Sequence, residues 1–180
     1  MKVIETEFNG VRFRSRTEAR WAVFMACANI KYIYEPEGFD LGEGGWYIPD
    51  FWLPEIDKFL EIKPSVPLVG RESPTFALAD ATGKAVITFC GPPSAPDFDR
   101  GYREDGHFHS KEGGDNCYWF CRCPECGSAG IEFCGRADRI KCECPKSPHQ
   151  DKGYNFDDPF LLFAYKEASN AFRFKRRNYE

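Results

Sequence analysis

Residues 46 to 64 read WYIPDFWLPEIDKFLEIKP, a run of aromatic and β-branched residues that is broken by a few charged side chains. The run predicts a strand over WYIPDFWLP, a turn at PEID and a second strand over KFLEIKP. Asp50, Glu61 and Lys63 stand where a plain buried strand would have apolar side chains. Because an unpaired buried charge costs several kcal/mol, we expect these three side chains to have partners.

The spacing of these charged residues predicts that they meet on one patch. Residues two apart in a strand share a face, so Glu61 and Lys63 project together. Asp50 precedes Glu61 by 61 − 50 = 11 residues, about the separation that a hairpin needs to place them opposite each other. Two close carboxylates repel unless a cation lies between them, and Mg²⁺ prefers such oxygen ligands. Lys63 can orient or activate a water, or stabilise charge in a transition state.

A hairpin and a helix are predicted before this patch. Apolar and polar residues alternate on both sides of Asn9-Gly10, a strong turn signal. The helix spans about 15–29, where Ser15 and Glu18 have the spacing of a capping box. Glu18 also lies in line with Trp21 on the inward face. It therefore either closes the cap only or adds a third carboxylate to the patch.

The elements over residues 31–91 place the chain in the mixed α/β class, in its α+β form. We expect a strand over 31–41, whose regular part ends at Glu35-Pro36, and a flexible link at GEGG. The two strands of 46–64 follow, then a short helix over SPTFALADATG and a buried strand over KAVITFCG. The order is helix, three strands, helix, strand.

The character of the sequence changes after Gly91. Turn formers and charges dominate residues 92–115, which predict a long loop. A helix is predicted from about Pro159, with inward positions at Leu162, Tyr165, Ala168 and Phe172. We therefore expect three regions: a core at 1–91, a loop and cysteine-rich module at 92–152, and a basic C-terminal helix at 153–180 that packs on the core.

The cysteine-rich module predicts a zinc site. Seven of the nine cysteines fall within CYWFCRCPECGSAGIEFCGRADRIKCEC, residues 117–144. Cys123-Pro-Glu-Cys126-Gly predicts a tight turn whose amides point at two thiolates, and Cys142-Glu-Cys144 supplies a second pair. Four thiolates around Zn²⁺ form a closed structural site. The alternatives left open are Cys121, Cys134 or His149 in place of one of these ligands. His107 and His109 are expected to be exposed.

Composition limits the partners and the compartment. No apolar run is long enough to span a membrane, and MKVIETEFNG is not a signal segment, so we expect a cytoplasmic protein. A net charge of −4 argues against a general nucleic-acid coat protein. Two basic clusters are nevertheless present, one over residues 12–20 and one over 173–177. Each is either a solvated face or a contact surface for nucleic acid.

The combination of Glu18, Pro49-Asp50 and Glu61-Ile62-Lys63 resembles the motif of the PD-(D/E)xK nuclease superfamily. FRSRTEARWAVF, YEPEGFDL and YIPDFWLP also resemble its small phage-type members, so the resemblance covers residues 7–90. It implies a restriction-endonuclease-like αβββαβ core. It further implies that Asp50, Glu61, Glu18 and the Ile62 carbonyl hold Mg²⁺ or Mn²⁺, and that Lys63 serves the attacking water.

The function implied is a metal-dependent nuclease that hydrolyses DNA, with an endonuclease acting on structured or duplex DNA as the main expectation. The protein would act in the cytoplasm, of a host cell if a phage encodes it, and a homodimer is one of its open assembly states. The residues expected to contact DNA are Arg14, Arg16, Arg173, Lys175, Arg176 and Arg177. The alternative is a non-catalytic, zinc-containing nucleic-acid-binding or adaptor protein. An iron–sulfur cluster is the rival of zinc, since some nucleases of this superfamily hold one.

Overall fold

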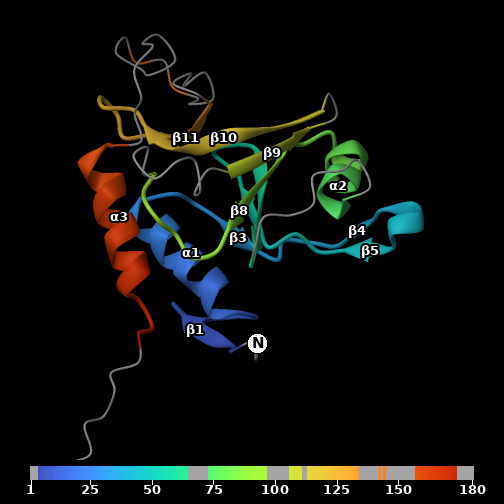
Figure 1. Cartoon of the computed structure of the whole chain (residues 1–180), viewed down its shortest axis with the longest axis horizontal. Helices are drawn as coiled ribbons and strands as arrows, with labels where there is room; N and C mark the ends of the chain where they lie inside the picture. The colour runs from blue at the N-terminus through green and yellow to red at the C-terminus, as the bar shows by residue number, and fades with distance from the viewer. Residues whose placement is uncertain are drawn as a thin grey trace, which may run out of the picture.

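A seven-stranded sheet forms the centre of the computed structural model of this chain (Figure 1). Its strand order is β11-β10-β9-β8-β7-β6-β3, in which β7 and β8 are parallel and all other neighbours are antiparallel. The structure describes residues 4–64, 73–96, 106–110, 113–133, 142, 144 and 157–173. For 106–110, 113–117, 132 and 133 it describes the backbone alone.

The expected mixed α and β class is confirmed. The described helices are α1 (Arg16–Cys27), α2 (Pro74–Thr82), α3 (Pro159–Asn170) and the short 3₁₀ helix η1 (Gly42–Gly44). The strands of the large sheet are β3 (Ile33–Tyr34), β6 (Phe51–Leu53), β7 (Lys58–Lys63), β8 (Val86–Cys90), β9 (Gly106–Ser110), β10 (Gly113–Arg122) and β11 (Ala129–Phe133). Two separate hairpins pair β1 (Thr6–Phe8) with β2 (Val11–Phe13) and β4 (Phe39–Asp40) with β5 (Trp46–Tyr47). None of the described helices is long and apolar enough to cross a membrane.

Helices α1 and α3 lie side by side over one face of the sheet (Figure 1). Their contact is aromatic: the rings of Phe24 and Tyr165 are 4.3 Å apart, and Phe24 is 5.1 Å from Phe120 of β10. Leu60 and Ile62 of β7 point into this core. The packing buries the inward side of α1 completely, which is the main source of stability for a short helix.

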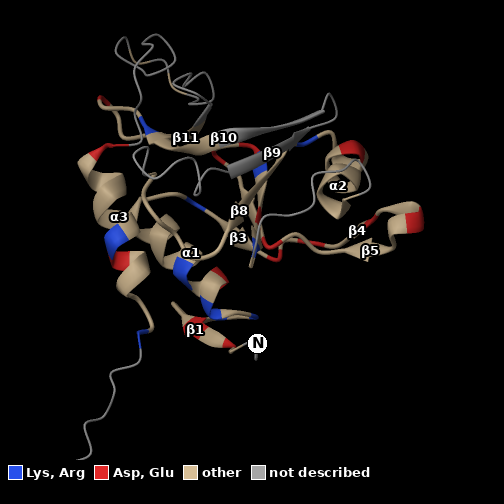
Figure 2. Ribbon diagram, viewed as in Figure 1, with Lys and Arg blue, Asp and Glu red and all other residues tan. Residues whose placement is uncertain are grey.

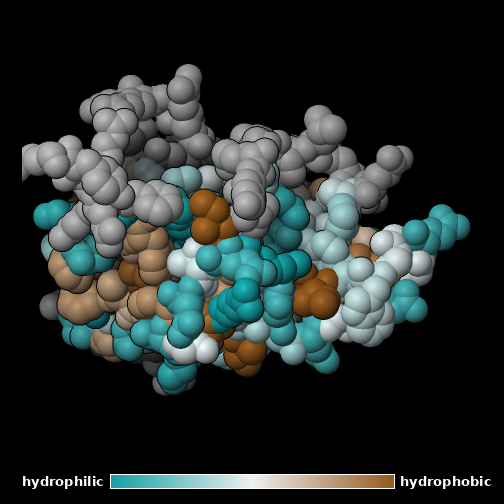
Figure 3. All heavy atoms as spheres, turned by 90° about the horizontal axis from the view of Figure 1, so that it is seen from below, coloured by the Kyte–Doolittle hydropathy of each residue, from teal (hydrophilic) through white to brown (hydrophobic). Residues whose placement is uncertain are grey.

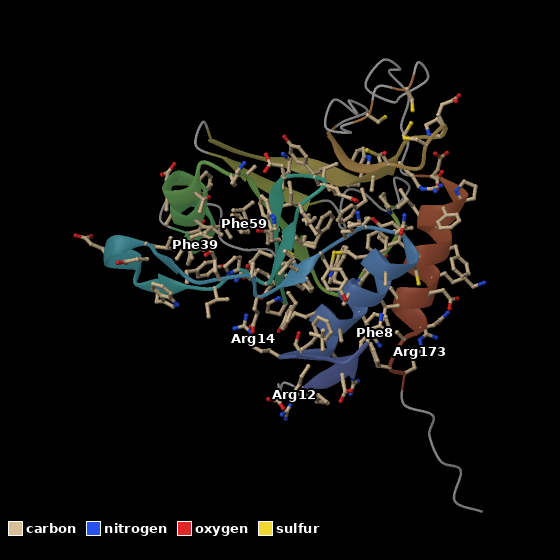
Figure 4. All side chains as sticks on the ribbon, turned by 180° about the vertical axis from the view of Figure 1, so that it is seen from behind. Phe8, Arg12, Arg14, Phe39, Phe59 and Arg173 are labelled. Atoms are coloured by element: carbon tan, nitrogen blue, oxygen red, sulfur yellow. The ribbon has the colours of Figure 1, made fainter. Side chains whose placement is uncertain are left out.

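Helix α2 and the β4–β5 hairpin cover the opposite face. Phe59 of β7 packs there with Leu78 of α2, and the Phe39 ring of β4 lies 5.5 Å from the Phe59 ring (Figure 4). Since side chains alternate along a strand, Glu61 and Lys63 belong to this face with Phe59. The two faces of β7 therefore differ: Leu60 and Ile62 enter the apolar core on one face, and the other face has Glu61 and Lys63.

The first turn of α1 is capped by its own side chains. The Ser15 hydroxyl accepts a hydrogen bond from the Glu18 amide at 3.1 Å, as expected for an N-cap. The Glu18 carboxylate does not return to the Ser15 amide, as a capping box requires. It accepts a hydrogen bond from the Ser15 hydroxyl at 2.6 Å. Glu18 is also buried, as its position in line with Trp21 predicted.

Gly91 links α1 to the end of β7. Its amide donates to the carbonyl of Lys63 at 2.8 Å, and its carbonyl accepts the indole N–H of Trp21 at 2.9 Å. Its φ of +73° lies in the left-handed region, which favours glycine. The backbone of Lys63 is thus fixed through one residue to a buried tryptophan.

Two of the expected strands are divided. The strand over 31–41 becomes β3 and β4, because Glu35 has a φ of +44° and Pro36 follows it. The strand over 46–54 becomes β5 and β6, because Pro49 lacks the N–H that a continuous ladder needs. The GEGG segment forms η1, which closes the β4–β5 hairpin.

The long loop predicted over 92–115 was wrong in part. Residues 106–110 form β9, and β10 begins at Gly113. The backbone of β9 pairs with β8 on one side and β10 on the other, so these residues extend the sheet. Interior pairing on both sides stabilises a strand that has weak periodicity of its own.

The predicted face of the C-terminal helix was also wrong in part. The buried residues are Leu161, Ala164, Tyr165 and Ala168, whereas Leu162 is exposed. The helix begins at Pro159, as expected, and Asp158 caps it by accepting from the Phe160 and Leu161 amides. It ends at Asn170, before the basic residues, and Phe172 follows with a φ of +55°. The α3 helix is therefore apolar on its inner side and is not itself basic at its end.

Phe24→Ala tests the packing of α1 against α3 and β10. Removing this fully buried ring should lower the free energy of unfolding by about 3–5 kcal/mol. The matched control is Phe163→Ala on α3, whose side chain is exposed and whose loss should cost under about 0.5 kcal/mol. Urea denaturation measures both values, and equal effects of the two substitutions would contradict this core.

Candidate metal centres

Asp50, Glu61 and Lys63 lie together, as the sequence predicted. The pairing of Phe51 with Leu60 in β6 and β7 places Asp50 opposite Glu61. The Lys63 ammonium is 2.6 Å from Glu61 Oε1, and the Asp50 amide lies 3.3 Å from Glu61 Oε2. Asp50 Oδ2 accepts a hydrogen bond from the Ile62 amide at 2.7 Å. The two carboxylates are therefore fixed where β6 separates from β7.

Both carboxylates are almost completely buried. The exposed fraction is 5% for Asp50 and 4% for Glu61. Arg14 approaches from the segment after β2, with Nη2 3.2 Å from Asp50 Oδ1 and Nε 2.5 Å from Glu35 Oε1. Lys63 and Arg14 are thus the cations that face the pair, and both side chains reach solvent. The patch therefore reaches solvent on the side of Lys63 and Arg14 and is enclosed by the sheet on the other side.

The charge of this patch is only partly compensated. Burial, followed by repulsion from Glu61, raises the pKa of Asp50 far above the usual range of a carboxylic acid. Tyr47 of β5 is near the same pair: burial and Glu61 raise its pKa too. The Tyr47 hydroxyl is buried and has no partner at hydrogen-bond geometry among the described residues, and Lys63 lies 6.0 Å from the ring centroid. An added cation between the carboxylates would stabilise their ionised forms.

Glu18 is close to the patch but is held by other groups. The Tyr34 hydroxyl donates to Glu18 Oε2 at 2.6 Å, and Ser15 donates to the other oxygen. Glu18 affects Asp50 electrostatically. Its helix, however, covers the face of the sheet opposite to Glu61. The three carboxylates are therefore not gathered as tightly as the cysteines described next.

Four cysteines form a compact group of sulfur atoms. The ligand atoms of Cys123, Cys126, Cys142 and Cys144 all lie within 4.8 Å of one another, and no other described group of three or more acidic, histidine or cysteine side chains does so. These are the four residues predicted from the sequence. Cys123 and Cys126 belong to the turn between β10 and β11, beside the start of α3, where sulfur atoms gather in Figure 4. The cluster can hold a metal ion such as zinc.

The turn at 123–128 positions its thiols through the backbone. The Gly127 amide donates to the Cys123 carbonyl at 2.9 Å, and the Cys123 amide donates to the Ser128 carbonyl at 2.8 Å. The amides of Glu125 and Cys126 donate to the Cys123 sulfur, and the Ser128 amide donates to the Cys126 sulfur. Amides directed at sulfur stabilise thiolates, the form that binds metal. The expected tight turn is confirmed.

The electrostatics of the cluster also favour a cation. The hydroxyl and the amide of Ser128 lower the pKa of Cys126 to about 6. The neighbouring Cys126 raises the pKa of Cys144 to about 12. Cys126 ionises readily, and Cys144 beside it resists ionisation. A group of four cysteines without a metal should behave in this way, because each thiolate repels the next negative charge. Zinc accepts four thiolates in a tetrahedral shell, so this donor set fits it.

The alternative ligands fall into two groups. Cys121 is buried beside Cys123 but is not part of the close group of four. Cys134 and His149 lie outside the described residues, and the side chains of Cys117, His107 and His109 are not described. Cys27 and Cys90 are half-buried cysteines elsewhere, and neither is in a disulfide.

The two basic clusters of the sequence meet at the junction of α1 and α3. The Arg20 guanidinium donates to the Ala171 carbonyl at 3.1 Å, and burial together with Arg16 and Arg173 lowers its pKa. Arg14 stands apart at the carboxylates, whereas Arg173 lies beyond the end of α3 (Figure 4). Lys175, Arg176 and Arg177 lie outside the described residues.

Two residues of the carboxylate patch were not predicted from the sequence. Tyr34 holds Glu18, and Tyr47 lies beside Glu61. Both come from short strands that the sequence pattern treated as parts of longer ones. The alternation Trp46-Tyr47-Ile48 indicated only that Tyr47 faces one side of a strand, and its hydroxyl gave no sign of a charged neighbour.

Comparisons of the chain with models of protein families, with curated proteins and with solved structures found no match. We therefore base the function on the chemistry of the two centres.

Asp50→Asn tests the electrostatics of the carboxylate patch. Asp50, with a pKa of about 8 in the fold and about 4 when unfolded, binds its proton more tightly in the folded chain. Its contribution to stability is therefore complete below about pH 4 and is lost as the pH rises through about 8. The loss is at most about 1.4 kcal/mol per pH unit.

Asn at this position has no charge to lose. Relative to the wild type, Asp50→Asn should gain stability from pH 5 to pH 8, in the absence of divalent metal. Thermal melting at both values measures this, with Asp57→Asn as the control because Asp57 is paired with Lys84 at the surface. Parallel pH profiles for wild type and Asp50→Asn would contradict the raised pKa.

Purified protein should contain about one zinc ion per chain, measured by elemental analysis. Cys126→Ser and Cys142→Ser should lower the zinc content and the melting temperature, and a chelator should destabilise the wild type towards the level of these variants. Cys90→Ser, a half-buried thiol on β8, is the matched control and should keep its zinc. Iron in place of zinc, or metal-free protein as stable as its cysteine variants, would contradict a zinc site.

Proposed function

We propose that this chain is a metal-dependent nuclease that hydrolyses phosphodiester bonds in DNA, as an endonuclease acting on structured or duplex DNA. One observation supports this above all others. Two nearly buried carboxylates, Asp50 and Glu61, lie on neighbouring strands with the Lys63 ammonium 2.6 Å from Glu61. The proposal also draws on the resemblance of these residues to the PD-(D/E)xK motif.

The donor set of the patch fits a hard divalent cation. Asp50 and Glu61 provide oxygen ligands, and a cation between them would offset the burial and the repulsion that raise the pKa of Asp50. Asp50, Glu61 and the Ile62 carbonyl would hold Mg²⁺ or Mn²⁺, with Glu18 completing the set from α1. When bound, the ion would polarise the phosphate and lower the pKa of a water.

The side chains of the patch have distinct parts in this proposal. Lys63 has three N–H donors, and Glu61 occupies one of them. A further donor can hold the attacking water or a phosphate oxygen, and the ammonium stabilises the charge that develops there. Arg14 reaches solvent beside Asp50, so its guanidinium can neutralise a phosphate that approaches the patch. Tyr34 keeps Glu18 in place by a hydrogen bond.

The DNA would lie along the basic surface near α1. Figure 2 shows basic segments on α1 next to the β1–β2 hairpin and on α3. Arg14, Arg16 and Arg173 would contact phosphates, as would Lys175, Arg176 and Arg177 beyond the described residues. Such contacts position a duplex without reading its sequence. They also make binding weaker at high salt.

The cysteine cluster supports a second function, that of a non-catalytic zinc-containing nucleic-acid-binding or adaptor protein. It is the tighter of the two centres, and its donor set is complete without any other residue. Four thiolates leave no open coordination position for chemistry. In this alternative, the ion pairs of Asp50 and Glu61 would be structural.

Glu61→Gln and Lys63→Ala separate the two functions. Each should reduce the Mg²⁺-dependent cleavage of plasmid and branched DNA by about 100-fold or more. The controls are Glu55→Gln and Lys31→Ala, which alter an exposed ion pair with a similar distance of 2.7 Å at another position. Cleavage is measured on gels at a fixed protein concentration. Cutting that persists in both site variants would remove the proposed site, and a wild type that cuts none of these substrates would favour the adaptor.

A further inference from the structure

Trp46 is a large aromatic side chain on the surface of the β4–β5 hairpin. Its exposed fraction is 70%, whereas Trp21 and Trp119 are buried in the core. Trp46 pairs with Asp40 across the hairpin, and the adjacent pair is Phe39 with Tyr47. Phe39 and Tyr47 face the core at α2, so alternation directs Trp46 to the outer side. Ile48 is on this outer side too and is 40% exposed.

The indole is seated on a glycine. A Cβ atom at Gly38 would lie 2.1 Å from Trp46 Nε1 and 2.3 Å from Cε2, so a side chain at this position would displace the ring. Gly38 is not among the glycines with positive φ, so its backbone does not require glycine. Glycine at this position lets the Trp46 ring lie against the backbone. The ring therefore lies against the chain just before β4 and is otherwise largely exposed.

The same hairpin is attached to the carboxylate patch. Tyr47 follows Trp46 directly, and its hydroxyl lies near Glu61, with Lys63 over its ring at 6.0 Å. The chain then passes through Pro49 to Asp50. Figure 3 shows this end of the molecule projecting from the body, with apolar side chains beside it. Trp46 thus lies four residues after the start of η1 and four residues before Asp50.

We infer that Trp46 is a stacking platform for an unpaired base of the nucleic acid strand whose phosphate binds at Asp50, Glu61 and Lys63. This inference rests on the proposed function and names its substrate class: DNA with single-stranded nucleotides next to the cleaved bond. Bases have two flat apolar faces, and an exposed indole with two rotatable side-chain bonds offers a matching face. Lys63 and Arg14 supply the positive charge that the backbone of the same strand needs.

The experiment measures binding by fluorescence anisotropy of labelled DNA without added Mg²⁺. The probes are a single-stranded oligonucleotide and the same strand in a duplex. Trp46→Ala should weaken single-strand binding by about 5- to 100-fold and leave duplex binding nearly unchanged. Trp46→Phe should retain most of the wild-type affinity for the single strand. Gly38→Ala should weaken single-strand binding because its methyl group displaces the indole.

Phe163→Ala on α3 is the matched control, since it removes another aromatic ring that is 54% exposed. It should bind both probes like the wild type. The inference is overturned if Trp46→Ala binds the single strand as the wild type does, if it weakens both probes equally, or if the wild type binds neither probe. It is also overturned if Trp46→Ala changes only the oligomeric state in sedimentation, because the indole then contacts a second copy of the chain.

These outcomes are separable from those of the cleavage assay. If the wild type cuts DNA and Trp46→Ala binds and cuts every substrate as well as the wild type does, the stacking role of Trp46 is wrong and the nuclease function stands. If the wild type cuts no substrate but Trp46→Ala still weakens single-strand binding, the hydrolytic function is wrong and the stacking role of Trp46 stands.

Discussion

The burial of Asp50 and Glu61 side by side is the constraint on which the rest of this structure depends. Each carboxylate is held by the backbone of the neighbouring strand, so the sheet itself keeps two like charges together. Arg14 and Lys63 compensate them from the solvent side. Burial and the neighbouring Glu61 raise the pKa of Asp50, although Arg14 and Lys63 face the pair. The arrangement costs stability in the absence of a further cation, which is common at functional sites.

The cysteine cluster lies at a turn of the sheet that also holds the carboxylate patch, and the two sets of donor atoms suit different metals. Thiolates on a tight turn suit a soft, closed site, and carboxylates on strands suit a hard cation that exchanges its water. The turn at 123–128 is joined to α3 by Arg122, which lies 3.7 Å from Asp158 and stacks at 4.4 Å on Phe160. A metal held there would therefore stabilise the start of α3 and, through α3, the core around α1.

The sequence predicted the charged strands and the cysteine ligands because both depend on local spacing. Period-two alternation places Glu61 with Lys63, and a hairpin of known length brings Asp50 opposite. The extension of the sheet by β9 was not predictable in this way, because its pairing with β8 joins residues far apart in the chain. The roles of Tyr34 and Tyr47 were missed for a similar reason: a hydroxyl acquires its partner only when short strands from different hairpins pack together. Leu161 and Leu162 are adjacent, and the contact of α3 with α1, not periodicity alone, decided which one is buried.

The position of Gly91 affects how substitutions away from the charged side chains should be interpreted. Its amide donates a hydrogen bond to the Lys63 carbonyl, and its carbonyl accepts one from the Trp21 indole. Trp21 in the core and Lys63 in the patch are therefore connected through the backbone of a single residue. A lesion at Trp21 or Gly91 that leaves the chain folded can still shift the ammonium relative to the carboxylates. Genetic screens for inactive protein would then return these two positions together with the charged residues, although neither has a charged side chain and Gly91 contacts Lys63 through the backbone alone.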